Sequence, residues 1–156
     1  MRVSKMAAVN WTLIETLTLR DEAIKWPWCV AAPMLRDVTY LRITAAGSWI
    51  AAGEQLMPFP PDGHMGLPIQ SDKLLLPDTP VGALIGRIGG SSASLVITPS
   101  ATGDALLASQ TFAIGSHCVI AVPERLLGPL FVGFNWKPRP IMVKELTVSV
   151  FGAAPG

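Results

Sequence analysis

The stretch Val38-Thr39-Tyr40-Leu41-Arg42-Ile43-Thr44 decides the fold class, because its polar and apolar side chains alternate at period two. Successive side chains of a β-strand point to opposite faces of a sheet, so one face of this stretch enters a core while the other meets water. Thr16-Leu17-Thr18-Leu19-Arg20 repeats the alternation. Half-buried strands of this kind are typical of antiparallel sheets.

Further β-type runs are separated by glycine and proline. They lie at Leu95 to Thr98, Phe112 to Ile114, Cys118 to Val122, Leu130 to Trp136 and Ile141 to Phe151. We expect the two runs on either side of Gly115-Ser116 to form a hairpin, and the last two runs to pair across the connector Lys137 to Pro140. With almost no helical periodicity, the chain is predicted to be one all-β domain over residues 1–156.

The composition describes a compact and weakly charged protein. Of 156 residues, 50% are hydrophobic and only 15% charged, with a formal net charge of +1. Such a chain lacks the basic excess that nucleic acid requires, and it is too apolar for disorder. Val81 to Ile88 and Ala105 to Pro123 are apolar on both faces of the expected strands. We therefore expect self-association or a protein partner that covers an apolar sheet face.

Cys29 and Cys118 have neither the number nor the spacing of a disulfide scaffold or a zinc site, and free thiols are expected.

No signal-peptide pattern is found near the N-terminus, which leaves the compartment unknown. Ala105 to Pro123 carries no charge, yet polar residues interrupt it well below the length of a membrane span. We expect no membrane span.

Residues Glu54 to Pro80 contain six prolines in the stretch MPFPPDGHMGLPIQSDKLLLPDTP and have no clean period. Long irregular excursions inside small domains are usually functional, so residues 54–80 are the first place to look for a site. The glycines of Val81 to Gly90 lack the Lys-Ser/Thr of a phosphate loop. This segment is interpreted as a buried strand.

The order of several segments is similar to a known family. These are a first strand near Trp11, then Ala45-Ala46-Gly47-Ser48-Trp49, Pro61-Asp62-Gly63, Gly82-Ala83-Leu84-Ile85-Gly86-Arg87-Ile88-Gly89, Phe112-Ala113-Ile114-Gly115, Gly128-Pro129-Leu130, Gly133-Phe134-Asn135 and Leu146-Thr147-Val148-Ser149-Val150. From about Trp11 to Val150 the chain resembles the bacterial LecA-like (PA-IL) galactophilic lectins and related jelly-roll domains. The resemblance implies an antiparallel β-sandwich, jelly-roll and galactose-binding-like, of about eight strands.

In that family, a calcium ion held by backbone, Asp and Asn oxygens contacts the sugar. Only Asn135 of this ligand set is matched here, because Trp136 stands where the acidic ligand should follow. Three cations, Lys137, Arg139 and Lys144, occupy the same region. A calcium ion needs an oxygen cage with carboxylate charge, so we expect neither this metal nor any other cofactor.

The resemblance places polar side chains for sugar at Asp62, His64 and Gln70. Trp49, Phe59 or Trp136 is the candidate aromatic face for the sugar ring, and Asn135 completes the candidate set. Ordinary loop polar groups and core aromatics are the alternative. His64 with Asp62, Asp72 and Asp78 leaves a metal site as a weaker alternative.

Other features have two interpretations each. Trp26-Pro27-Trp28 is either a binding platform or, as favoured here, part of the core. Lys137, Arg139 and Lys144 either meet an acidic partner or form a solvated loop. His117 and Cys118 point to opposite faces of a strand and cannot act as base and nucleophile, and no catalytic constellation is found.

The sequence therefore favours a non-enzymatic carbohydrate-binding module without calcium, with a glycan as a possible partner. The alternative is a structural or adaptor subunit of a larger assembly, such as a secretion apparatus, a toxin complex or a phage particle. Low charge and the missing metal ligands favour that alternative.

Overall fold

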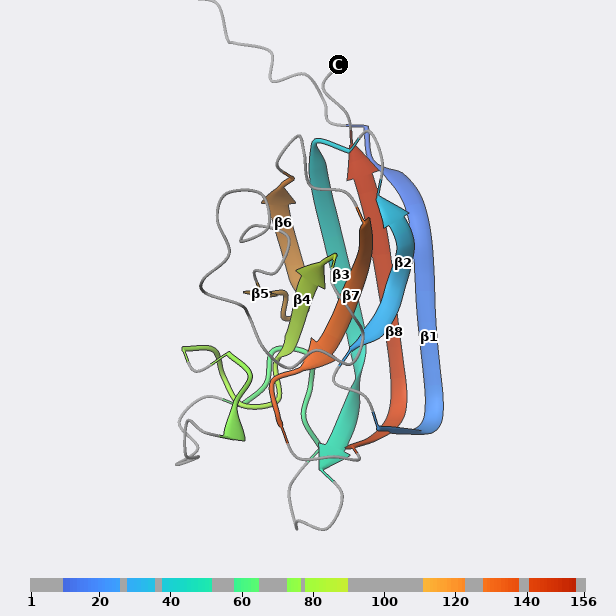
Figure 1. The fold of residues 1–156 in the computed structure, drawn as a ribbon. Coiled ribbons are helices and arrows are strands. Elements are labelled where there is room, and N and C mark those ends of the chain that lie inside the picture. Colours follow the sequence, from blue (N-terminus) through green and yellow to red (C-terminus); the bar gives the residue numbers. More distant parts are fainter. Residues whose placement is uncertain are drawn as a thin grey trace, which may run out of the picture.

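The computed structural model describes residues 10–25, 28–35, 38–51, 58–64, 73–76, 78–89, 111–122, 128–137 and 141–153. These residues form eight strands and no helix that could cross a membrane (Figure 1). The strands are β1 (Thr12–Ile24), β2 (Cys29–Leu35), β3 (Tyr40–Ala51), β4 (Leu84–Ile88), β5 (Thr111–Ala113), β6 (His117–Ala121), β7 (Gly128–Phe134) and β8 (Ile141–Ala153).

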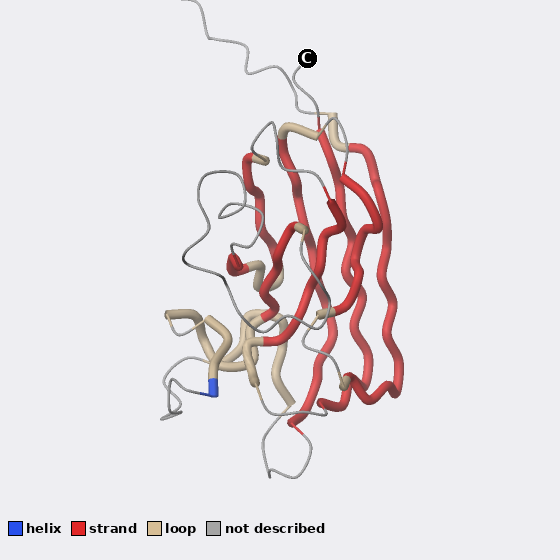
Figure 2. Tube along the Cα trace, in the orientation of Figure 1, coloured by secondary structure: helices blue, strands red, loops and turns tan. Residues whose placement is uncertain are grey.

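The strands form two four-stranded antiparallel sheets, as the sequence predicts. Sheet A has the order β1-β8-β3-β6, and sheet B has the order β2-β7-β4-β5. Figure 2 shows the strands of the two layers running roughly alongside one another, with described loop segments at both ends and most of them at the lower left. Each strand is followed by a strand of the other sheet, except for β4 and β5, and this alternation is the order of an eight-stranded jelly roll.

Alternating side chains from both sheets fill the space between them. In β3, Leu41, Ile43 and Trp49 are buried, and Val148 and Val150 of the neighbouring β8 join the same core. The intervening residues of sheet A face outward, as alternation requires. A fully buried aliphatic side chain contributes roughly 1.5–3 kcal/mol, so this layer supplies much of the stability of the fold.

The expected strand partners are wrong in two places. β5 pairs with β4 in sheet B, whereas β6 pairs with β3 in sheet A, so the turn at Gly115-Ser116 connects two sheets and is no hairpin. In the same way β7 and β8 belong to different sheets. Alternation identifies which face of a strand is buried, but short connections between sandwich layers look like hairpin turns in sequence.

Strand β2 is not predicted from the sequence, because Pro33 interrupts a short apolar run. It lies at the edge of sheet B and pairs only with β7, and an edge strand tolerates a proline that cannot donate to the ladder. Trp28, just before β2, is buried, as the core interpretation predicts, whereas Trp26 lies outside the described residues.

The inner strand β4 is buried on both faces, and the interface expected there is wrong. Trp28, Ile85 and Phe131 form a second apolar cluster, against which Leu75 and Leu76 of the same chain pack. The two-sided apolar pattern of Val81 to Ile88 is therefore satisfied inside one chain. Cys29 and Cys118 lie in different sheets, and no disulfide joins them, as predicted.

Candidate functional site

Part of the long excursion packs against the end of the sandwich through aromatic stacking. Phe59 and Trp49 exchange two backbone hydrogen bonds, and their rings stack with centroids 4.7 Å apart. The Trp49 Nε1–H group donates to the carbonyl oxygen of Gly82 at 2.8 Å. Gly82 has φ +78°, and a β-carbon there would lie 2.5 Å from the Phe59 ring. The site region is thus built around a closely packed aromatic pair.

Asn135, at the end of β7, holds the next part of the excursion. Its side-chain oxygen accepts from the backbone N–H of Leu76 at 2.8 Å. Its amide nitrogen lies 2.9 Å from the oxygen of Leu76, 3.0 Å from that of Thr79 and 3.1 Å from that of Pro80. Asn135 is fully buried, and its side chain is occupied by these backbone groups. The one residue that matches the lectin calcium ligands therefore has a structural role here.

Asp62 lies near the surface, beside the turn that leads into β6. Its Oδ1 accepts from the backbone N–H of Ser116 at 2.7 Å, and its Oδ2 accepts from the Ser116 hydroxyl at 2.9 Å. Gly115 has φ +66°, and a β-carbon there would lie 2.6 Å from the Asp62 Oδ1 atom. Asp62 therefore caps a tight turn and holds the excursion to it.

His64 is also engaged locally. Its Nε2 lies 3.0 Å from the carbonyl oxygen of Pro58, so that nitrogen carries the hydrogen. The imidazole packs against Phe59 with ring centroids 5.0 Å apart. The sequence predicts His64 and Phe59 as parts of one sugar site, whereas in the structure the two rings pack against each other.

The expected aromatic platform for a sugar is wrong. Trp49, Phe59 and Trp136 are each at most 1% exposed, so none offers a ring face to a ligand. Trp49 is covered by Phe59 and by Phe134, and the Lys73 ammonium lies over the Trp136 ring. Gln70, Asp72 and Arg139 lie outside the described residues.

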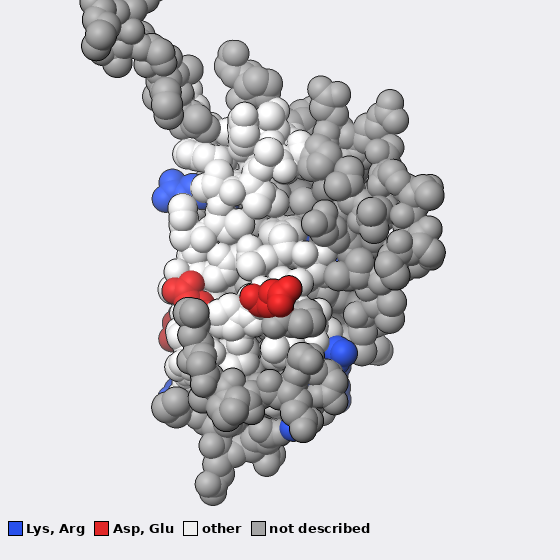
Figure 3. Space-filling model, turned by 90° about the vertical axis from the view of Figure 1, so that its left-hand side faces the viewer, with Lys and Arg blue, Asp and Glu red and all other residues white. Residues whose placement is uncertain are grey.

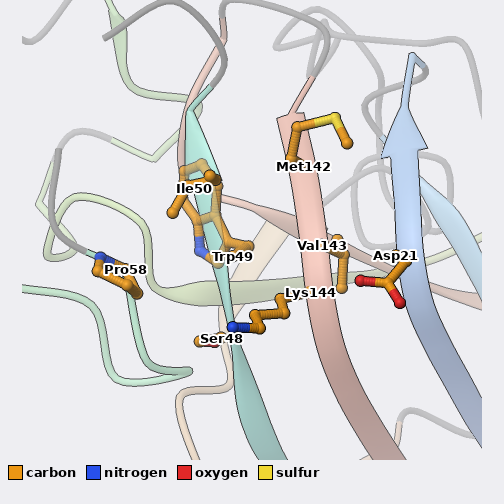
Figure 4. Close-up of a pocket in the computed structure, with 8 residues that line it drawn as sticks. All are labelled: Asp21, Ser48, Trp49, Ile50, Pro58, Met142, Val143 and Lys144. Atoms are coloured by element: carbon orange, nitrogen blue, oxygen red, sulfur yellow. The ribbon is translucent and has the colours of Figure 1, made fainter. Parts of the chain in front are cut away.

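A hollow of about 380 Å³ lies where β1 and β3 end and β8 begins, near the excursion (Figure 4). We call it the β3–β8 hollow. Its polar lining consists of Asp21, Ser48 and Lys144. Its apolar lining consists of Trp49, Ile50, Pro58, Met142 and Val143. The volume is within the range of about 300–1,000 Å³ that small-molecule sites occupy.

Cross-strand pairing explains this arrangement. Ile50 and Met142 stand directly opposite each other on β3 and β8, and both are exposed. Directly opposite residues share a face, so the pair forms an outward apolar patch. Pro58, whose carbonyl oxygen bonds to His64, adds a further apolar surface. The excursion thus contributes one residue, Pro58, to the lining of the hollow.

A register shift brings the polar groups to the rim. Ser48 pairs with Glu145 but Trp49 pairs with Val143, so Lys144 is an extra residue in β8. Bulges of this kind redirect side chains and are frequent beside binding sites. Asp21 has φ 47°, a left-handed conformation that is uncommon for a residue other than glycine. No sequence signal marks Asp21, although Lys144 was noted as part of a basic cluster.

At the opposite end of the same outer face, three of the four residues in one cross-strand row are apolar. The register places Leu13, Phe151, Arg42 and Val119 in one row across all four strands of sheet A. Leu13 is 54% and Val119 51% exposed, and the Arg42 guanidinium lies 5.7 Å from the centre of the Phe151 ring. On the side drawn in Figure 3, few of the described residues are charged, and these are separated by uncharged surface.

Among the described residues, no three His, Cys, Asp or Glu side chains gather in a way that could hold a metal ion. No protein-family model matches the chain, and no curated protein matches it significantly.

Proposed function

We propose that this protein is a non-enzymatic carbohydrate-binding module that takes its ligand in the β3–β8 hollow, without calcium. The observation that carries the proposal is the combination of an apolar patch, Ile50 and Met142, with polar groups of three kinds at its rim. Saccharides need both, because their C–H surfaces pack on apolar groups while their hydroxyls require donors and acceptors.

The three polar side chains supply complementary hydrogen-bonding roles. The Asp21 carboxylate accepts, the Lys144 ammonium donates, and the Ser48 hydroxyl does both. Each bond contributes about 0.5–1.5 kcal/mol net, and immobilising the ligand offsets much of this gain. We therefore expect weak binding, with a Kd on the order of 1 mM for a monosaccharide.

The test is a titration of the protein with monosaccharides, followed by NMR spectroscopy, in the presence of a chelator. Met142→Asp places a charge on the apolar patch and should weaken binding about tenfold or more. Val119→Asp is the matched control, because it makes the same kind of change on an exposed β6 residue outside the hollow. Loss of binding in both variants, or in neither, would contradict this location of the site.

A second candidate function is a structural or adaptor module that contacts protein. It is favoured by the exposed apolar row Leu13, Phe151 and Val119, together with Tyr40, which is 42% exposed on the same face. Exposed apolar residues gathered on one face, here on both sides of Arg42, are typical of protein contacts. The row and the hollow lie at opposite ends of sheet A, so the two functions are compatible, and their tests are separate.

A further inference from the structure

We infer that the preferred ligand of the β3–β8 hollow carries a carboxylate, so that an acidic saccharide such as a uronic acid binds better than the matching neutral sugar. This inference rests on the proposed function, and it follows from how charge is distributed around the hollow.

The ammonium group of Lys144 is available for a ligand. Its side chain runs from β8 toward Ser48 on β3 and away from Asp21 (Figure 4). Within the described part of the chain, no carboxylate lies within ion-pair distance of it. Its neighbour Glu145 is instead bound to Arg20, with an Nη2 to Oε1 distance of 3.7 Å. The acid nearest to Lys144 along β8 is therefore already paired with another cation.

Lys144 and Ser48 together form a site for an anionic oxygen. An ammonium and a hydroxyl can each donate to one carboxylate, and hydrogen bonds between charged groups are stronger than those of a neutral sugar hydroxyl. The adjoining apolar patch of Ile50 and Met142 lowers the local dielectric constant and strengthens this attraction.

Asp21 fixes the orientation of such a ligand. Its carboxylate lies on β1, across β8 from the Lys144 ammonium. Like charges repel, so the acid group of the ligand is placed at the Lys144 end, and ligand hydroxyls are placed at the Asp21 end. A sugar acid satisfies both ends at once, whereas a neutral sugar leaves the ammonium without an anionic partner.

The test compares galacturonic acid with galactose, which differ in the oxidation of one carbon, by NMR titration of the parent protein. We expect the acid to bind about tenfold more tightly, and the preference to fall as salt is added. Lys144→Gln should weaken the binding of galacturonic acid more than that of galactose, so that the preference falls below about twofold. Lys25→Gln is the control, because it removes the same charge from an exposed residue that does not line the hollow.

The outcomes separate this inference from the proposed function. Equal affinity of the parent protein for the two sugars, or an equal loss of preference in both variants, would overturn the role of Lys144 and leave carbohydrate binding intact. Binding of neither sugar at about 10 mM would overturn both. Unchanged thermal unfolding of the two variants establishes that any difference is a difference in binding.

Discussion

The carboxylate of Asp62 accepts two hydrogen bonds from Ser116, one at 2.7 Å from its backbone nitrogen and one at 2.9 Å from its hydroxyl. These residues are 54 positions apart, so the contact ties the excursion to the turn between the two sheets. Asp62→Ala should therefore lower the free energy of unfolding by about 1–2 kcal/mol, measured by urea denaturation, while leaving sugar affinity unchanged.

Ser116→Ala provides the comparison, because it removes only the hydroxyl bond and should cost less than the Asp62 change. The double variant should cost no more than Asp62→Ala alone, since both bonds need the carboxylate. An Asp62→Ala protein of normal stability that no longer binds sugar would mean that this residue contacts the ligand directly.

Asn135 should be among the most sensitive polar positions of the chain. Asn135→Ala leaves buried backbone groups of Leu76, Thr79 and Pro80 without their partner, so we expect a loss of about 2–4 kcal/mol in the free energy of unfolding. Lys137→Ala, two positions away at an exposed residue, should change stability by less than about 0.5 kcal/mol. Equal losses of stability in the two variants would contradict the structural role of the Asn135 side chain.

The sequence predicted which segments form strands better than it predicted which strands pair with each other. Leu41 and Ile43 were placed on the core face by alternation alone, and the apolar Leu84–Ile88 run was correctly interpreted as a strand buried on both faces. Alternation carries no information about which strand lies alongside, and this is why β5 and β6 were wrongly paired. The packing of Leu75 and Leu76 against the apolar cluster at β4 was not predicted either, because these two residues come from an irregular segment.

The site was predicted less well for a related reason. Trp49, Phe59 and His64 do come together, but hydrophobicity and close packing place both aromatic rings inside, where no ligand reaches them. The hollow combines Asp21 with Lys144, which are distant in sequence and are brought together by the β1–β8 register and a bulge. Neither a register nor a bulge is visible in a single sequence.

Calcium should have no effect on stability. A ligand that binds only the native state stabilises it by RT ln(1 + [L]/Kd), so a functional calcium site would raise the melting temperature when calcium is added. Asn135 is occupied by backbone groups, and Trp136 stands where the acidic ligand is expected. Differential scanning calorimetry with calcium and with chelator should give the same melting temperature, and a rise of several degrees would contradict the proposed calcium-free site.

Cys118 should react slowly with alkylating reagents near neutral pH. Burial raises the pKa of the Cys118 thiol, because desolvation disfavours the thiolate, and the thiolate is the reactive form. Its rate of alkylation should therefore start to rise only above the pH range of an ordinary cysteine. A Cys29→Ser variant isolates the signal for mass spectrometry. Modification at pH 7 at the rate of an ordinary exposed cysteine would contradict the raised pKa of this half-buried thiol.

The apolar row of sheet A predicts self-association. Leu13 and Val119 are more than half exposed, and the register aligns them with Phe151 and Arg42 across four strands, so pairing with a second copy would remove the apolar surface on both sides of Arg42 from water. Light scattering at increasing protein concentration should give a molar mass that approaches twice that of one chain.

Val119→Asp or Leu13→Asp should return the molar mass to that of a monomer, because each would bury an unpaired charge in the interface. Met142→Asp introduces the same charge in the hollow at the opposite end of the face and should leave the mass unchanged. A parent protein that stays monomeric at about 1 mM would contradict association through this row, because a Kd weaker than that corresponds to less than about 4 kcal/mol of binding free energy.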